Sequence, residues 1–378
     1  NEWKILWNVP CCLRSVDTVY MGAGGGSIGW VDKGGILNVG PQSQGAMPGP
    51  ACYGMGGDEA TNTDVQIVLG RINPDYFLGG EMDVYPELSY KALKEKIGDI
   101  YGWNAKEAAQ KMYMVAMTNL MLAMRLQTVS RGWDPRDFAL IPYGGGGAMY
   151  ICDLARESGA TKVVVPPLPG YASAFGAIRV DVRHEFVRPI YKIERELDYD
   201  DLNKKMDELV REGIDMLMKE GVKESDMIIR RMMDVKYFSQ SRFFTVDIPV
   251  GRISDLKVAT DNFLKAMKAE YGYIMPPGYV PIEVVALRVE AVGLIPKAEL
   301  APIERKGELK DALKKPREVW FKDAGFIKTD IYERERMPLG ATFSGPAIIE
   351  QQDTTTVIPP KSNCKVDQYG NILIDVLK

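Results

Sequence analysis

Glycine-rich stretches near the start of the chain have the composition of a loop at a functional site. One covers residues 21–32 and includes Gly24, Gly25, Gly26 and Ser27, and a second covers residues 40–54. So much glycine beside apolar residues indicates a backbone that turns with positive φ or that lies close to another group. We therefore expect a site loop here, and the alternative is a set of tight hairpins that bind no ligand.

Another glycine run has the setting of a nucleotide-binding turn. It consists of Gly144, Gly145, Gly146, Gly147 and Ala148. The apolar pattern predicts a buried strand over residues 138–143 before it, and a helix over 149–158 and a strand over 162–165 after it. Ligands of open α/β sheets bind at such strand ends, where helix N-termini attract phosphate or ribose oxygens. The spacing matches neither the dinucleotide motif nor a P-loop, so we expect a nucleotide site of another type.

Few side chains near these loops could act as acids, nucleophiles or metal ligands. Asp64 is the candidate acid, although its carboxylate could instead cap a helix over residues 65–70. For Cys52 a buried structural thiol is favoured over a nucleophile, and for His184, which lies among charged residues, a hydrogen-bonding role is favoured over catalysis. A single histidine excludes a multi-histidine metal site within this chain, so we assign no metal-ligating residue.

The elements expected to position these residues change in character along the chain. A hairpin is predicted from residues 27–32 and 36–39, and a long helix over residues 105–130, where Asn104 and Glu107 resemble a capping box. The region 193–296 has amphipathic helices near 202–217 and 263–271 and strands near 227–238, 243–248 and 281–292, which predicts a separate α+β domain.

The remaining segments complete the expected domain order. Residues 1–192 form the first domain with the glycine loops, residues 297–317 an exposed connection rich in Lys, Glu and Pro, and residues 318–378 a β-rich C-terminal segment. The apolar residues near Trp3 have no obvious partner nearby, and the chain does not start with Met. We therefore expect a fragment, a processed subunit or an incomplete chain.

Composition narrows the class of protein. The chain has 378 residues, 47 Lys and Arg against 51 Asp and Glu, and a net charge of −4. It has no basic run, so neither nucleic acid nor a membrane is expected as a partner. The apolar runs are far shorter than the ~18 residues that span a bilayer. Five cysteines without zinc-like or disulfide-like spacing favour a reducing cytoplasm.

A set of ordered motifs closely resembles the hydantoinase A/oxoprolinase family, which includes subunits of acetone and acetophenone carboxylases. The resemblance is close over residues 17–189 and again from residue 342, and looser between them. It rests on Gly22 to Ile28 with Trp30 to Asp32, Gly40-Pro41, Gly49 to Gly54, Thr63-Asp64 and Leu69 to Arg71, and at the other end on Gly345 to Glu350, Asp353 to Thr356 and Val366 to Asn371.

This resemblance implies the C-terminal part of an actin-like, ribonuclease-H-type ATPase core. In such a core ATP, with Mg²⁺, phosphorylates a carbonyl or enolate oxygen of a small substrate. Gly144 to Ala148 take the place of the adenosine-binding turn, and Gly24, Gly25, Gly26 and Ser27 face the phosphate or the substrate. The family pattern implies a hydantoinase B-type partner subunit.

Two departures from the family pattern bear on the chemistry. The acidic-Gly-Gly-Thr phosphate motif that family members carry upstream of the first loop is absent, so we expect it on another chain. Tyr150 stands where many relatives have a histidine, so no role of that histidine is carried over. Catalysis by this chain alone is therefore not expected.

Three functions remain open at this point. The stretch from Ser173 to Gly176 resembles the ketone-carboxylase branch, which we favour, whereas the block 22–54 keeps the pattern of the ring-opening hydantoinases and oxoprolinases. The absent phosphate motif is the reason for a third hypothesis, a non-catalytic scaffold subunit.

Overall fold

The computed structural model describes residues 4–6, 9–11, 18–19, 22–276, 278–297 and 304–376. The chain divides into two compact units. One comprises residues 1–15 and 176–299, and the other, which carries the candidate site, comprises residues 16–175 and 300–378. No helix in the described part of the chain is both long enough and apolar enough to cross a membrane.

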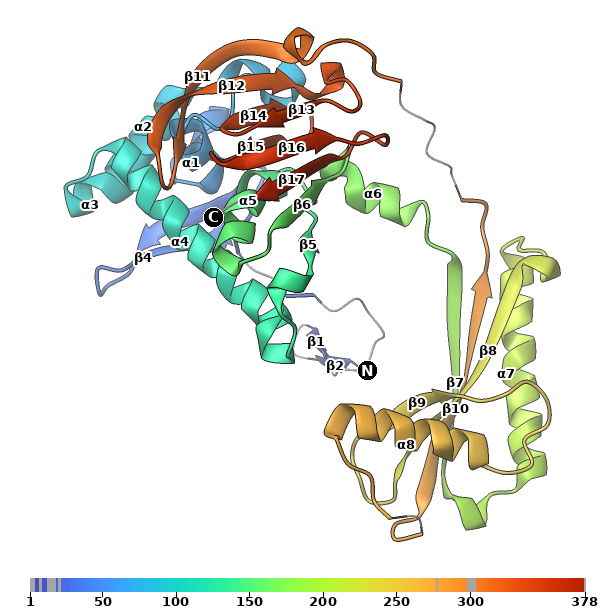
Figure 1. Ribbon diagram of the computed structural model, residues 1–378. Helices are drawn as coiled ribbons and strands as arrows, with labels where there is room; N and C mark the ends of the chain where they lie inside the picture. Colours follow the sequence, from blue (N-terminus) through green and yellow to red (C-terminus); the bar gives the residue numbers. More distant parts are fainter. Residues whose placement is uncertain are drawn as a thin grey trace. The chain divides into compact units, whose positions relative to one another are not determined.

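The site-bearing unit contains two sheets that share a core with one helix (Figure 1). The first sheet has the order β13-β16-β17-β6-β5 and the second β11-β12-β14-β15. Helix α5 (Gly147–Ser158) places Ala148, Ile151, Cys152 and Ala155 in this core. The strands are β5 (Ala139–Leu140), β6 (Lys162–Val165), β11 (Leu313–Phe321), β12 (Gly325–Glu333), β13 (Thr342–Ser344), β14 (Ala347–Glu350), β15 (Thr355–Ile358), β16 (Ser362–Val366) and β17 (Ile372–Val376).

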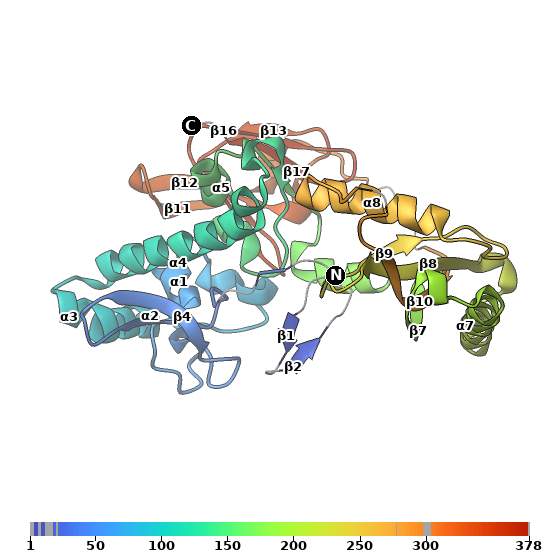
Figure 2. The same ribbon diagram turned by 90° about the horizontal axis from the view of Figure 1, so that it is seen from below.

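A second core of this unit forms around the long helix α4 (Ala105–Gln127), which is seen at full length in Figure 2. As predicted, Asn104 caps the helix and the Glu107 carboxylate accepts a hydrogen bond from the Asn104 amide, which together make a capping box. Ala108, Met112 and Ala116 are fully buried, so these positions are core. Helices α1 (Asn62–Val68) and α2 (Pro86–Leu93) pack against α4. The predicted hairpin is β3 (Ser27–Val31) with β4 (Leu37–Ser43).

The other unit contains a four-stranded antiparallel sheet with two helices, and its described N-terminal residues form the antiparallel pair β1 (Lys4–Leu6) and β2 (Val9–Cys11). The strand order of the four-stranded sheet is β7-β10-β8-β9. The apolar faces of both helices share one core with the sheet, as the period of their apolar residues predicted. The elements are β7 (Val182–Ile193), α7 (Tyr199–Lys219), β8 (Met227–Tyr237), β9 (Phe244–Asp247), α8 (Lys257–Tyr271) and β10 (Ile282–Gly293).

Some expected elements and boundaries differ from those observed. The buried strand expected at residues 138–143 is only the two-residue edge strand β5, and Ile141 and Tyr143 after it are exposed, because β5 has only β6 as a neighbour. Strand β7 pairs along its length with β10, so residues 182–192 belong to the unit of the α+β region. Strand β11 begins inside the connection expected at 297–317. Of the apolar residues near Trp3, Ile5 and Leu6 pair with Pro10 and Val9, whereas residues 1–3 lie outside the described residues.

Candidate functional site

Two glycine-rich loops, residues 21–32 and residues 144–148, both contribute to one cavity, which has a volume of about 340 Å³. Gly25 and Thr63 come from the first loop and helix α1, and Gly145 and Gly146 come from the turn before α5. The remaining wall consists of Tyr53, Ile72, Asn73, Tyr76, Phe77, Leu78, Met149 and the six residues 350–355. The cavity thus joins three regions that lie far apart along the chain.

The first glycine loop is held against the start of α1. The carbonyl oxygen of Gly25 accepts hydrogen bonds from the Thr63 amide (2.9 Å) and from the Thr63 hydroxyl (3.1 Å). A Cβ at Gly25 would lie 2.8 Å from that hydroxyl oxygen, so a side chain there would force the loop to move. Gly25 lines the cavity, whereas Gly24 and Gly26 do not, and Ser27 is buried at the start of β3.

The glycine run at residues 144–147 forms the turn into helix α5. Gly144 has a φ of +78°, which favours glycine, and its amide donates to the Pro169 carbonyl (2.8 Å). Gly145 and Gly146 line the cavity. Gly146 is the N-cap of α5 and offers no side-chain acceptor, while Gly147 and Ala148 belong to the helix itself. Of the five predicted residues, two therefore face the cavity and three support the turn.

A wall of aromatic and apolar side chains faces the cavity. The rings of Tyr53 and Phe77 lie 5.7 Å apart at an angle of 58°, and Met149 contributes a thioether. Burial raises the pKa of the Tyr53 hydroxyl, with a further contribution from Cys52 and Asp64. A surface of this kind suits a flat organic group such as a base or a ring. Only Tyr53 belonged to a motif noted in the sequence, and no local signal identified Phe77.

The segment 350–355 supplies polar groups that the sequence analysis did not assign to the site. The Thr354 hydroxyl donates to the Gly145 carbonyl (2.6 Å), and the Asp353 carboxylate accepts from the Gly170 amide (2.6 Å). The available signal was Asp353 to Thr356 in the C-terminal motif, but the sequence could not show which loop this motif meets.

Glu350 is a buried carboxylate at the edge of the cavity. It forms ion pairs with Lys314 and Arg317, and its side chain is 2 % exposed. Burial alone would raise the pKa of this carboxyl, but the hydrogen bonds and charges of Lys314 and Arg317 outweigh burial and lower it. Glu350 is therefore held in its charged form.

Asp64, the candidate acid, does not line the cavity, because its carboxylate stabilises the backbone. The side chain is completely buried. One oxygen accepts from the amides of Ala51 and Thr61 and from the Thr61 hydroxyl, and the other accepts from the Cys52 amide and the Ser89 hydroxyl. The N-cap of α1 is Thr61, and Asp64 completes the capping box. The loop-stabilising interpretation of Asp64 is the one that its contacts support.

Cys52 and His184 also make structural contacts. The Cys52 thiol is buried, and burial raises its pKa far above the ordinary value, which makes it a poor nucleophile. His184 lies in the other unit, where its Nε2 is 2.9 Å from the Glu220 carboxylate. Among the described residues, no group of three His, Cys, Asp or Glu side chains is placed to hold a metal ion.

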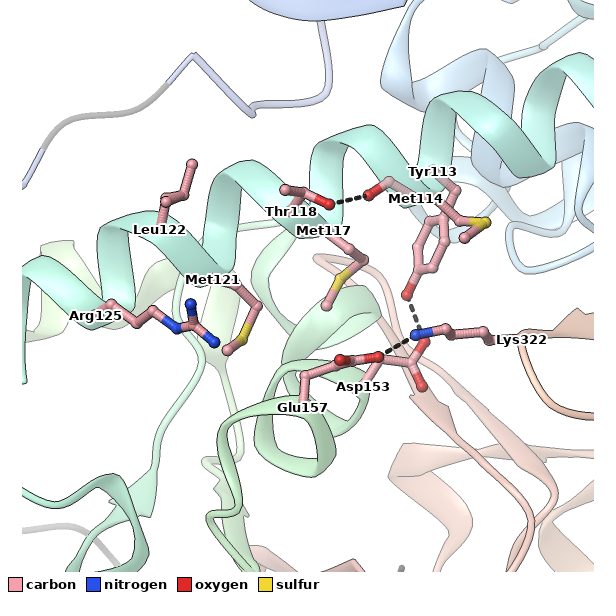
Figure 3. A pocket seen from close by; sticks show the side chains of 10 residues that line it. All are labelled: Tyr113, Met114, Met117, Thr118, Met121, Leu122, Arg125, Asp153, Glu157 and Lys322. Atoms are coloured by element: carbon pink, nitrogen blue, oxygen red, sulfur yellow. Dashed lines mark hydrogen bonds and ion pairs between the residues drawn. The ribbon is translucent and has the colours of Figure 1, made fainter. Parts of the chain in front are cut away.

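A second cavity, of about 250 Å³, lies between α4, α5 and the turn that joins β11 to β12 (Figure 3). Met114, Met117 and Met121 of α4 line one side of it. The hydroxyl of Tyr113, which is also on α4, donates to Asp153 of α5, and Lys322 pairs with Glu157 of α5. No residue of the two glycine loops lines this cavity, so the first cavity is the better candidate for a nucleotide.

Comparison with known proteins identifies the family. Residues 2–186 match the hydantoinase/oxoprolinase family, and residues 192–374 match the hydantoinase/oxoprolinase C-terminal domain. An uncharacterised protein of Methanocaldococcus jannaschii is 37% identical over 366 residues, which are 97% of this chain and 52% of that protein. The acetophenone carboxylase gamma subunit of Aromatoleum aromaticum is 30% identical over 379 residues, 97% of this chain and 51% of the relative.

Further relatives and two solved structures agree with this match. The caprolactamase subunit alpha of Pseudomonas jessenii is 30% identical over 355 residues, 92% of this chain and 51% of the relative. The crystal structure of ATP-dependent caprolactamase from that organism has a TM-score of 0.76 at 27% identity, and nucleotide-free acetone carboxylase, at 23% identity, has the same fold with a TM-score of 0.77. Each match covers 94% of this chain and 52% of the solved chain.

The chain therefore spans about half the length of the relatives it matches. Its two family matches follow one another and leave only a few residues between them and at either end. The solved relatives confirm the expected α/β fold class. On these grounds the chain belongs to the hydantoinase/oxoprolinase family.

Proposed function

We propose that this chain is the nucleotide-binding part of an ATP-dependent enzyme that phosphorylates a carbonyl or enolate oxygen. The observation that carries this proposal is the shared cavity, which brings Gly25, Gly145 and Gly146 together. Its volume of about 340 Å³ suits a nucleoside or a small ring rather than a large ligand.

The residues around the cavity fit the parts of a nucleotide. The base and ribose would lie against Gly145, Gly146 and the wall of Tyr53, Phe77 and Met149. The open N-terminus of α5, which has no side-chain cap, favours a negatively charged or oxygen-rich group nearby. Gly25 would face the phosphates or the substrate, with Mg²⁺ neutralising the phosphate charge.

The chemistry that ATP supplies is activation of an unreactive oxygen. The γ-phosphoryl group passes to the substrate oxygen, ADP leaves, and the oxygen becomes a good leaving group. The described residues contribute binding and orientation: they fix the glycine turns and bury the nucleoside. The described acids that line the cavity are Glu350 and Asp353, and both oxygens of each carboxylate already have partners within this chain. The reacting groups would therefore come in part from partner chains, including a hydantoinase B-type subunit.

Ketone carboxylation is the reaction we favour, in the cytoplasm and with a small ketone as the substrate. It is supported by the 30% identity to an acetophenone carboxylase subunit over 97% of this chain. The second candidate is hydrolysis of a lactam, hydantoin or 5-oxoproline, supported by the 30% identity to the caprolactamase subunit alpha.

One set of assays on the assembled complex distinguishes these functions. ATP-dependent incorporation of labelled bicarbonate into acetone or acetophenone would support the carboxylase. ATP hydrolysis that starts on addition of 5-oxoproline, a hydantoin or caprolactam, without bicarbonate, would support the ring-opening enzyme. A complex in which this chain binds no ATP would contradict both and would leave the scaffold role.

A further inference from the structure

Residues 351–354, which follow strand β14, connect two loops at the mouth of the candidate nucleotide cavity. The Thr354 hydroxyl donates to the carbonyl oxygen of Gly145 at 2.6 Å. The Asp353 carboxylate accepts from the amide of Gly170 at 2.6 Å. The two loops also contact each other, because the Gly144 amide donates to the Pro169 carbonyl at 2.8 Å. Asp353 and Thr354 thus complete a hydrogen-bonded ring around the turn that carries Gly145.

This segment is itself fixed from the protein interior. Gln351 is 4% exposed, and its side-chain amide donates to the Pro167 carbonyl (3.1 Å) and to the Asp353 carboxylate. The Gln351 side-chain oxygen accepts from the guanidinium of Arg334 at 3.0 Å. Arg334 is buried and also donates to the carbonyl oxygens of Val165 and Gly370. Asp353 therefore has a defined place relative to the end of strand β6.

The backbone at Gly170 and at Gly145 lies close to Asp353, which is a second, independent sign that Asp353 fixes the positions of these two loops. A Cβ at Gly170 would lie 2.6 Å from the nearer carboxylate oxygen of Asp353 and 2.7 Å from its Cβ, so only glycine fits there. A Cβ at Gly145 would lie 3.4 Å from the Asp353 carbonyl oxygen. Asp353 and Thr354 line the cavity together with Gly145.

We propose that Asp353 and Thr354 are positioning residues of the nucleotide site, which hold the Gly144–Gly147 turn in the conformation that accepts the nucleoside. This inference rests on the proposed function, since it assigns the cavity to ATP. The hydroxyl of Thr354 fixes the Gly145 carbonyl, and the charge of Asp353 strengthens its hydrogen bond to Gly170. The C-terminal β-rich segment is then a part of the nucleotide site rather than a separate support.

The test compares T354V with T354S, and D353N with D367N, in the assembled complex. Valine keeps the shape of Thr354 but removes the donor, whereas serine retains it. In D353N the new amide NH2 group would face either the Gly170 amide or the Gln351 side-chain amide, so one of these two hydrogen bonds is lost. Asp367 is the matched control, because its carboxylate accepts hydrogen bonds within the hairpin that joins β16 to β17 and does not line the cavity. The readouts are the Kd for MgATP by calorimetry, and KM and kcat for ATP.

We expect T354V to raise the Kd and KM for ATP about tenfold and D353N to raise them further, with kcat at saturating ATP changed less than about threefold. T354S and D367N should bind ATP like the wild type. Wild-type affinity in both T354V and D353N, or equal losses in T354S and T354V, would overturn the inference. If D353N does not fold, T354V and T354S still decide the question. A wild-type complex without ATP affinity would instead contradict the proposed function.

Discussion

The guanidinium of Arg71 lies over the ring of Tyr113, with its central carbon 4.2 Å from the ring centroid. Both side chains contact Asp153 on helix α5: the Tyr113 hydroxyl donates to its carboxylate, and an Arg71 nitrogen lies 3.4 Å from the same oxygen. A further Arg71 nitrogen donates to the carbonyl of Met149 (3.4 Å), which lines the candidate nucleotide cavity. Arg71 therefore connects the first turns of α5 to helix α4.

Loss of Arg71 is expected to destabilise this unit strongly. In R71M the largely buried Asp153 carboxylate loses its cation, and the carbonyl oxygens of Trp320 and Met149 lose their donor. We expect the free energy of unfolding to fall by about 3–5 kcal/mol. Urea-induced unfolding followed by tryptophan fluorescence measures the change. The control is R125M, an exposed residue of α4 at the rim of the second cavity (Figure 3), for which we expect a change within about 0.5 kcal/mol. Equal effects of the two variants would contradict this assignment.

Substitution of Asp64 should lower the stability of the fold rather than act directly on turnover. In D64N an amide NH2 group would face N–H or O–H donors that now donate to the carboxylate, so we expect a loss of about 2–4 kcal/mol. The matched control is D58N, whose ion pair with Lys96 is exposed and screened by solvent, so that its loss should change stability little. Thermal unfolding of both variants provides the comparison. A D64N protein that unfolds like the wild type but has lost turnover would show that Asp64 acts in catalysis.

The pH dependence of stability should report Glu350. Its pKa is lowered below the ordinary value of 4.5, so the folded state favours the charged form. The stabilisation is fully present above pH 4.5 and is lost as the pH falls through the lowered pKa of the folded state. E350Q should therefore be less stable than the wild type at pH 7, by about 1–3 kcal/mol, and the difference should shrink below pH 4.5. Unfolding curves from pH 7 to 3 measure this difference. A difference that is constant across this range would contradict the assignment.

A side chain in the turn before α5 should block the nucleotide. The nearest atom to a Cβ at Gly146 would be the Met149 methyl carbon at 4.0 Å, so G146V has room to fold. Because Gly146 lines the cavity, we expect the valine to lower the affinity for ATP more than about tenfold. G176V, in a helix outside the cavity and equally free of steric contact, is the control. Unchanged ATP affinity in G146V, measured by calorimetry, would show that this turn does not hold the nucleoside. The same outcome is expected for G145V, although its Cβ also approaches Asp353.

The sequence predicts well those elements whose signals are local. Helix α4 begins at the predicted capping box, and the hairpin of β3 and β4 forms around the predicted turn, because caps and tight turns depend on residues a few positions apart. Strand β7 was missed, since its charged residues hide the alternation of its apolar ones. The burial of β10 on nearly every residue likewise depends on its two neighbouring strands.

The sequence predicts the loop residues of the candidate site but not the other side chains that line it. Glycine adopts backbone conformations that other residues rarely adopt, so a cluster of glycines indicates a tight loop. Gly25, Gly145 and Gly146 could therefore be predicted as site residues from the sequence. Phe77 and Asp353 have ordinary side chains, and only the tertiary fold brings them to the cavity. For Asp64 the decisive information was the set of donors around it, of which Ala51, Cys52 and Ser89 lie outside its own helix.

The pairing of β6 with β17 has a consequence for biosynthesis. Ile372 of β17 lies beside Val165 of β6, and residues 176–299, which form the α+β region, are encoded between these strands. On the ribosome that unit can fold as soon as it emerges, whereas β6 and the apolar face of α5 must wait, exposed, for β16 and β17. The candidate nucleotide cavity is completed only after residues 350–355 have been synthesised, which is after the whole stretch 176–299 has left the ribosome.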